Sequence, residues 1–182
     1  KYDVNPDMAI FAKALGNGYA ISACIGRKEF MQAAQNTFIS STFWTERIGP
    51  TAALKTLEIM EREKSWEKIT HTGKNIGERW KTLAQKYELP LDINGLPALI
   101  GFSFRLQNML KYKTLITQEM LKKGILAATS VYVCTEHKQP IIDKYFDALD
   151  PIFALIKECE QGRSIDDLLE GPVCHSGFKR LN

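Results

Sequence analysis

A short apolar run that stops at a lysine and then turns sets the tightest limit on how this chain can fold. Residues 8–12 (MAIFA) are apolar, Lys13 follows, and residues 16–18 (GNG) come three positions later. An apolar run bounded by turn residues predicts a buried strand. Glycine and asparagine adopt positive φ at little cost, so the chain can reverse at 16–18, and residues 20–25 predict a second strand. A lysine that ends a buried strand needs either an exit to water or a function.

Helical periodicity follows in the middle of the chain. A short helix is expected at residues 28–34, and residues 35–46 lack a helical period and predict a structured loop. A long helix should begin near Ile48, and Ser65 can cap a second one. Each carries an apolar stripe, formed by Ala53, Leu54, Leu57 and Met60 on the first and by Ile69, Ile76, Trp80, Leu83 and Tyr87 on the second. Gly73 lies on the second stripe and suggests a close contact between helices.

The remaining residues alternate between strand-like and helical patterns. Strands are expected at 91–94, 98–104 and 125–128, and helices at 112–123, at about 142–156 and at 165–169. From Gly162 onward the chain is mostly polar. Helices and strands interleaved in this order predict an α/β fold.

The length and the order of these segments suggest an incomplete domain followed by a complete one. The chain has 182 residues, and its first residue is Lys1 rather than Met. The strands before residue 50 cannot complete a sheet by themselves, so we expect the sequence to be part of a longer protein. Three segments are expected: residues 1–48 as the end of a larger domain, 49–88 as a helical connector, and 89–182 as a small α/β domain with a polar tail.

Charge and hydropathy argue against two classes of partner. The formal net charge is +3, and the 24 basic residues are spread along the chain. Such a mild and dispersed excess gives no reason to expect binding to nucleic acid or to a membrane surface. No run of about 18 apolar residues is present, so no membrane-spanning helix is expected.

The four cysteines lie far apart and form no CxxC pair. We therefore expect free thiols and a cytoplasmic location rather than a disulfide framework. Cys134 and Cys174 each have a histidine close by in sequence, but the spacing matches no zinc module, and no metal is expected.

Two interpretations of Lys13 follow from the residues alone. In the first, Lys13 is an ordinary strand-end lysine with its amine in water. In the second, the amine is partly desolvated and condenses with a carbonyl group, because burial among apolar residues favours the neutral, nucleophilic amine. A glycine turn that lets a flat cofactor approach would suit the second interpretation. The residues alone leave both open.

The segment PDMAIFAKALGNGYAISACIGRKEFM resembles the segment that carries the pyridoxal-phosphate lysine in class III aminotransferases, especially in their glutamate-1-semialdehyde aminomutase branch. The shared pattern is PD, an apolar strand, the lysine, an apolar pair, a glycine-rich turn, a second strand ending in glycine, and a helix. A second block, SSTFWTERIGPTAALKTLEIM, also resembles the family, and the resemblance extends more loosely to about His137. It implies that Lys13 is the Schiff-base lysine and that the cofactor is pyridoxal 5′-phosphate.

The resemblance also implies a contact to the cofactor phosphate. Thr42 matches the family threonine that binds this phosphate, in that family across the dimer interface, and Ser41 is a weaker candidate for the same role. A hydroxyl group can hold a phosphate without adding charge. A homodimer is therefore implied. Without the resemblance, residues 40–42 would be interpreted as an ordinary polar loop.

The loop after Thr42 departs from the family pattern. The family usually has Gly-Asn-Pro there, whereas this sequence has residues 45–47 (TER). Trp44, Glu46 and Arg47 become candidates for substrate contacts, although Arg47 can also pair with Glu46 or begin the helix. Residues 125–136 contain no arginine, so we do not expect the clamp that grips the substrate carboxylate in the ornithine and 4-aminobutyrate branches.

The fold and reaction that the resemblance implies are those of a fold-type I pyridoxal-phosphate-dependent transferase, of which this chain would be the C-terminal portion. Residues 1–48 would end the cofactor-binding large domain, and 89–182 would form the small domain that closes over the substrate. The implied reaction moves an amino group between a small-molecule donor and a carbonyl acceptor through an internal aldimine at Lys13. The lysine then moves a proton between the substrate carbon and the C4′ carbon of the cofactor.

Two alternatives stay open. An aminomutase of the glutamate-1-semialdehyde type would return the amino group to a neighbouring carbon of the same molecule. A non-catalytic α/β interaction module would carry Lys13 on its surface and would be colourless. In the family, the ring-stacking aromatic residue, the glycine-rich phosphate turn and the aspartate facing the pyridine nitrogen precede the lysine, so we expect the 182 residues alone not to turn over substrate.

Overall fold

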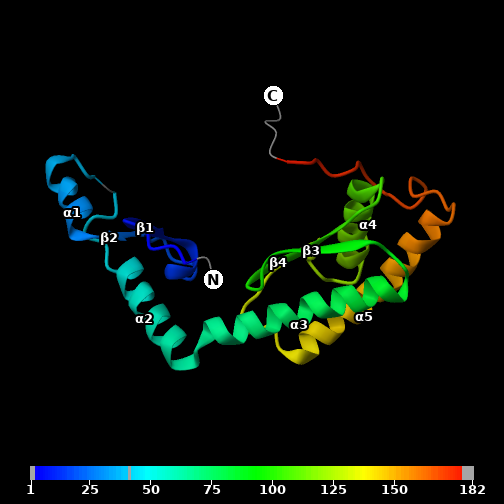
Figure 1. Cartoon of the computed structure of the whole chain (residues 1–182), viewed down its shortest axis with the longest axis horizontal. Helices are drawn as coiled ribbons and strands as arrows, with labels where there is room; N and C mark the ends of the chain where they lie inside the picture. Colours follow the sequence, from blue (N-terminus) through cyan, green and yellow to red (C-terminus); the bar gives the residue numbers. More distant parts are fainter. Residues whose placement is uncertain (1–2, 41, 178–182) are drawn as a thin grey trace. The chain divides into compact units, whose positions relative to one another are not determined.

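The computed structural model describes residues 3–40 and 42–177, which fall into two compact units divided after Ser65. The first unit contains β1 (Met8–Phe11), the 3-10 helix η1 (Lys13–Leu15), β2 (Ala23–Gly26), α1 (Lys28–Met31), the 3-10 helix η2 (Gln32–Asn36) and α2 (Ile48–Glu63). The second contains α3 (Ser65–Lys86), β3 (Leu91–Leu96), β4 (Leu99–Phe104), α4 (Met109–Lys122), β5 (Ser130–Tyr132) and α5 (Gln139–Glu160) (Figure 1). The division falls inside the segment expected as a helical connector, with α2 on one side and α3 on the other.

The first unit is built on a two-stranded antiparallel ladder, in which Met8 pairs with Gly26 and Phe11 with Ala23. We expected the first strand to be buried, and this is wrong for the described chain, because the side chains of Ile10 and Phe11 are 78% and 50% exposed. Among the described residues no third strand joins the ladder, so neither strand lies at the centre of a sheet. β2 is also shorter than the strand expected from the sequence.

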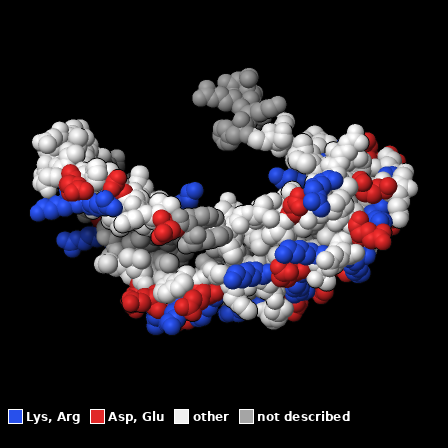
Figure 2. Space-filling view, in the orientation of Figure 1, with Lys and Arg blue, Asp and Glu red and all other residues white. Residues whose placement is uncertain are grey.

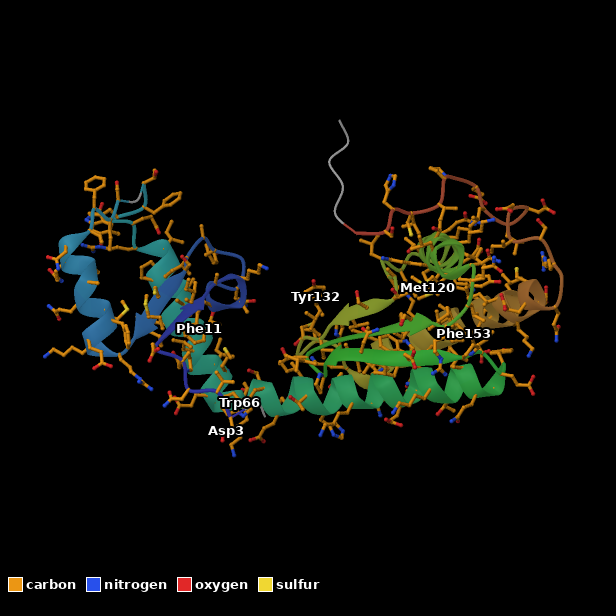
Figure 3. All side chains as sticks on the ribbon, turned by 45° about the horizontal axis from the view of Figure 1, so that its top comes forward. Asp3, Phe11, Trp66, Met120, Tyr132 and Phe153 are labelled. Carbon is orange, nitrogen blue, oxygen red and sulfur yellow. The ribbon has the colours of Figure 1, made fainter. Side chains whose placement is uncertain are left out.

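The second unit holds a three-stranded antiparallel sheet in the order β3-β4-β5. β3 and β4 form a hairpin closed by a two-residue turn, with Leu96 opposite Leu99. β5 pairs with the other edge of β4, where Tyr132 of β5 lies opposite Leu99 of β4 (Figure 3). The hairpin expected from the sequence is therefore present, with β3 two residues longer than expected and β4 beginning one residue later.

The third strand of this sheet is not where the sequence predicted it. Residues 125–128 were expected as a strand, but the strand covers residues 130–132. The N–H of Gly124 donates to the carbonyl oxygen of Leu121 at 2.9 Å, and the N–H of Ile125 donates to that of Met120 at 3.0 Å. Gly124 has a φ of +71°. This arrangement ends α4 and uses the backbone groups that a strand would need.

One face of β4 carries the core of the second unit. Phe102 and Phe104 point to the same face of the strand, and both are buried. The ring centroid of Phe102 lies 4.8 Å from that of Trp80 on α3 and 5.9 Å from that of Phe153 on α5 (Figure 3). Phe104 contacts Tyr112 on α4, with 6.2 Å between ring centroids. Three helices therefore cover one face of the sheet, where each fully buried large side chain stabilises the fold by about 1.5–3 kcal/mol.

Ion pairs connect α3 to α5 at the surface. Arg79 Nη1 lies 2.5 Å from Asp143 Oδ1, and Lys86 Nζ lies 2.6 Å from Asp150 Oδ2. Hydrogen bonds from Lys86 and then from Tyr87 hold the pKa of Asp150 below its ordinary value. Basic and acidic side chains lie side by side over the second unit on the face drawn in Figure 2. Exposed pairs of this kind contribute little to stability individually.

Residues 163–177 are attached to α4 by their backbone. Gln118 on α4 donates a hydrogen bond to the carbonyl oxygen of Leu168 at 2.9 Å and accepts one from the N–H of Glu170 at 2.8 Å. Ile165 is buried in the core of the second unit. Residues 165–169 form a turn and not the expected short helix, because the segment follows α4 instead of folding on itself.

Gly73 lies where α3 crosses the turn between β3 and β4. A Cβ atom at this position would lie 1.8 Å from the carbonyl oxygen of Pro97. The close contact suggested by the sequence is therefore with a hairpin turn and not with another helix. Although alanine favours helices more than glycine does, Gly73→Ala should destabilise the 182-residue chain by about 1–3 kcal/mol, because the helix or the turn must move.

Urea unfolding measures this effect, with Gly171→Ala as the control. No heavy atom lies within 4 Å of a Cβ atom at Gly171, so the control should unfold like the parent chain. A Gly73→Ala chain as stable as the parent would contradict the contact.

Candidate functional site

Lys13 begins η1, with one residue between it and the end of β1, and has an unusual backbone. Its φ is +53°, in the left-handed region that residues other than glycine rarely adopt. Its carbonyl oxygen accepts hydrogen bonds from the N–H groups of Gly16 and Asn17, at 3.1 and 3.2 Å. Backbone strain of this kind costs about 1–3 kcal/mol and concentrates at functional sites. Asp3, Asn17 and Lys64 of the first unit also have positive φ values, and Lys13 differs from them in lying between β1 and the turn at residues 16–18.

The turn after Lys13 requires a glycine. Gly16 is buried, and a Cβ atom there would lie 2.1 Å from the carbonyl oxygen of Tyr19 and 2.8 Å from Cγ2 of Ile21. Asn17 and Gly18 have positive φ values of +47° and +106°. The predicted reversal is confirmed, and it packs the chain closely beside Lys13.

The side chain of Lys13 is exposed. Within residues 3–40 and 42–177, its amine has no ion pair or hydrogen bond to another residue. In one of the two interpretations of Lys13, neighbouring apolar residues desolvate the amine. In the described chain they do not, because β1 leaves its apolar side chains largely open to solvent. The amine is accessible to a carbonyl compound.

Thr42 lies in the turn at 42–45, between η2 and α2, and its side chain is exposed. The weaker candidate, Ser41, lies outside the described residues. The backbone N–H of Glu46 donates to the carbonyl oxygen of Phe43 at 3.1 Å and closes a turn that begins one residue after Thr42. The structure thus presents the Thr42 hydroxyl on a turn directly before α2.

Glu46 caps the start of α2. Its two carboxylate oxygens accept hydrogen bonds from the N–H groups of Ile48 and Gly49, the second at 3.0 Å. These N–H groups have no partner within the helix, and a negative charge is favourable at a helix N-terminus. The side chains of Trp44 and Arg47 are exposed, and Arg47 makes no side-chain cap bond. Of the three candidate substrate contacts, Glu46 is thus engaged in holding the backbone.

The second unit has a hollow of about 560 Å³ beside β5, α5 and the end of α4. Its apolar lining residues include Ile125, Leu126, Val131, Tyr132 and Ile141. Tyr145 also lines it and accepts a hydrogen bond from Nε1 of Trp80 at 3.1 Å. Burial raises the pKa of Tyr145 above its ordinary value. This hydroxyl therefore stays protonated at neutral pH. The lining also includes Ser130, His137 and Lys144.

His137 and Cys174 each make a side-chain hydrogen bond within the chain. Nδ1 of His137 accepts a hydrogen bond from the N–H of Cys134 at 3.2 Å, and the Cys174 thiol donates to the carbonyl oxygen of Leu110. Within the described ranges, no three histidine, cysteine or acidic side chains are placed to share a metal ion. In the same part of the chain, no helix combines the length and the apolar character of a membrane span.

Comparisons with known proteins give similarities over most of the chain. The family model described as aminotransferase class III matches residues 1–140. The 3-aminobutyryl-CoA aminotransferase of Cloacimonas acidaminovorans (strain Evry) is 29% identical over 163 residues, covering 86% of this chain and 39% of that protein. The glutamate-1-semialdehyde 2,1-aminomutase of Methanosphaera stadtmanae is 24% identical over 166 residues, covering 82% of this chain and 39% of that protein.

A solved structure shares the fold. The FumI protein of Sphingopyxis sp. MTA144, solved in its PLP internal aldimine form, matches with a TM-score of 0.79 and 20% identity, covering 91% of this chain and 41% of that one. This likeness confirms the expected α/β fold. The chain spans about 40% of the length of the curated relatives and of the solved structure.

Proposed function

This chain belongs to the class III aminotransferase family, and on that basis we propose that the protein containing it moves an amino group from a small-molecule donor to a carbonyl acceptor, with pyridoxal 5′-phosphate as cofactor. When bound, this cofactor supplies an aldehyde that captures amines and a ring that accepts electrons. The described residues fit it at two points, through the exposed Lys13 amine and the exposed Thr42 hydroxyl.

The observation that carries the proposal is the backbone of Lys13. A lysine held at positive φ, beside a turn that tolerates only glycine at residue 16, has its backbone in a defined place at the cost of strain. We assign to Lys13 the covalent attachment of the cofactor. Once a substrate amine has displaced it, the Lys13 amine takes the proton from the substrate carbon that bears nitrogen and delivers it to the C4′ carbon.

Thr42 is proposed to donate its hydroxyl proton to a phosphate oxygen of the cofactor, with Ser41 as a weaker candidate, across the interface of a homodimer. Ile10 and Phe11 of β1 are exposed apolar side chains. Their exposure supports an interface here with a second copy or with another part of the protein.

The proposed place of each segment follows from the same assignment. Residues 1–48 would end the cofactor-binding domain, residues 49–88 would be the helical connector between the two domains, and residues 89–182 would form the small domain. The four cysteines are free, which fits a cytoplasmic location.

An intramolecular aminomutase is the second candidate. It is supported by the match to the Methanosphaera stadtmanae aminomutase and by the lack of arginine at 125–136. In that reaction, Lys13 would return the proton so that the amino group ends on a neighbouring carbon of the same molecule.

One experiment on the purified intact protein separates these functions. An absorption band near the visible edge that depends on pyridoxal phosphate, with nitrogen-15 passing from a labelled donor to a separate carbonyl acceptor, is the expected result. Label retained in a rearranged donor would indicate the aminomutase. A colourless protein without either reaction would contradict both and favour a non-catalytic module.

Replacing Thr42 with valine in the intact protein tests the phosphate contact. Valine keeps the shape and removes the hydroxyl, so cofactor binding should weaken by about 1–2 kcal/mol, which is roughly a 5- to 30-fold rise in Kd. Fluorescence titration of the apoprotein measures it. Thr45→Val, an exposed change in the same turn, is the control and should bind as the parent does. An unchanged Kd for Thr42→Val would rule the contact out.

A further inference from the structure

Residues 175–177 close a second hollow at the start of α4. It has a volume of about 270 Å³ and is bordered by the end of β4, the first turns of α4 and residues 175–177. We call it the α4 hollow. The N–H of Cys174 donates to Oγ1 of Thr114 at 2.9 Å, and the Cys174 thiol donates to the carbonyl oxygen of Leu110. These two bonds attach the chain to α4 directly before His175, so this wall of the hollow is held in place.

Lys113 is the lysine that lines the α4 hollow. The described chain has three half-buried lysines, Lys111, Lys113 and Lys157. Lys111 pairs with Asp166 at 2.6 Å. Lys157 pairs with Glu88 at 2.8 Å. Within residues 3–40 and 42–177, no carboxylate pairs with Lys113. A half-buried charge without a counter-charge is unfavourable, and an anion from outside the chain would supply one.

The rest of the lining supplies hydrogen-bond donors and apolar surface. Ser103, Thr129 and Ser176 carry hydroxyl groups, and His175 carries a ring N–H. None of the described residues that line the hollow is acidic. Its other lining residues are Phe102, Phe104, Met109, Leu110 and Gly177. The α4 hollow therefore combines groups that bind an anion with groups that contact an apolar molecule.

We propose that the α4 hollow binds a small organic acid, with its carboxylate at Lys113 and its apolar part against Met109 and Leu110. Ligand pockets commonly measure about 300–1,000 Å³, and this hollow is slightly smaller, so only a small molecule fits. A charged lysine makes strong hydrogen bonds to carboxylate oxygens, whereas the apolar surface offers nothing to a hydrated inorganic ion. The site lies wholly within the second unit and does not depend on the proposed cofactor site.

Benzoate is the probe, because it carries one carboxylate on a small apolar ring. Titration into the nitrogen-15-labelled 182-residue chain at constant ionic strength, followed by two-dimensional NMR, measures Kd and locates the binding residues. Saturable shifts are expected at residues of the α4 hollow, with Kd on the order of 1 mM. Benzamide has nearly the same shape without the charge, so it should bind at least about tenfold more weakly.

Lys113→Met keeps the apolar stem and removes the charge, so Kd for benzoate should rise at least about tenfold. Lys123→Met is the matched control, because Lys123 is an exposed lysine directly after α4 that does not line the hollow, and Kd should be unchanged. His175→Ala removes an exposed donor and should raise Kd by a smaller factor, roughly 2- to 10-fold. Urea unfolding checks that each variant is folded, and His175→Ala decides if Lys113→Met is not.

Four results would overturn the proposal. They are the absence of saturable shifts in the α4 hollow, equal Kd values for benzoate and benzamide, an unchanged Kd for the folded Lys113→Met chain, and, if that chain is unfolded, an unchanged Kd for His175→Ala. Inorganic phosphate is the last ligand tested. Tighter binding of phosphate than of benzoate would identify a phosphate site and would reject an organic acid as the ligand.

Discussion

Replacing Lys13 with alanine in the intact protein should abolish amino-group transfer, lowering kcat by at least about 1000-fold. The loss should be large because, in the proposed function, one amine serves both as the covalent attachment point and as the base that moves the proton. The Lys13→Ala protein should also lack the absorption band of the lysine-bound cofactor, while noncovalent binding through the phosphate persists. Steady-state kinetics and absorption spectra of the same preparations measure the two effects.

Two controls make this result specific to Lys13. Lys28→Ala changes an exposed lysine of α1 in the same unit and should leave kcat unchanged. Lys13→Arg keeps the positive charge but should be as inactive as Lys13→Ala, because a guanidinium does not give up its proton. Borohydride reduction of the parent holoprotein should place the pyridoxyl mass on Lys13 in a peptide map. The same mass on another lysine would overturn the assignment.

Replacing Trp80 with alanine should cost the second unit about 3–5 kcal/mol of unfolding free energy. Trp80 is fully buried between α3 and the sheet, where it contacts Phe102 and donates a hydrogen bond to Tyr145. Alanine leaves a cavity that the surrounding sheet and helices cannot close, and it removes the partner of the Tyr145 hydroxyl. Urea unfolding of the 182-residue chain, followed by far-ultraviolet circular dichroism, measures the loss.

Trp66→Ala is the matched control on the same helix. The side chain of Trp66 is 46% exposed, so this variant should differ from the parent by less than about 1 kcal/mol. If both tryptophan variants lost the same stability, the core position of Trp80 would be wrong.

Local sequence was sufficient where neighbouring residues decide the structure. The turn after Lys13 was predictable because Asn17 and Gly18 accept positive φ and Gly16 fits where a side chain would not. The periodicity of residues 65–86 and the alternation of 99–104 also matched the helix and strand that formed, since both patterns repeat within a few residues. Lys13 was predicted as the Schiff-base lysine from the family resemblance, with support from the residues around it. Its positive φ is a feature of the backbone that the sequence did not predict.

The capping of α2 by Glu46 was not predicted, although the sequence contains a signal for it. An acidic residue just before a helical stripe is a common helix-start signal, because the negative charge and the carboxylate oxygens meet unpaired N–H groups. The departure from the family pattern at residues 45–47 directed attention to substrate contacts instead.

The local elements follow from residues that are neighbours in the sequence: the lysine between strand and turn, the long helices, and the hairpin. Which of these elements are covered, and which strands pair, depends on contacts between distant parts of the chain. β5 forms at 130–132 because Gly124 and Ile125 are used to end α4, and Gly73 is required because the distant Pro97 packs on it. β1 is exposed although its sequence is apolar. Helix and turn propensities act within a few residues, whereas burial and strand pairing depend on partners that lie far along the chain or outside it.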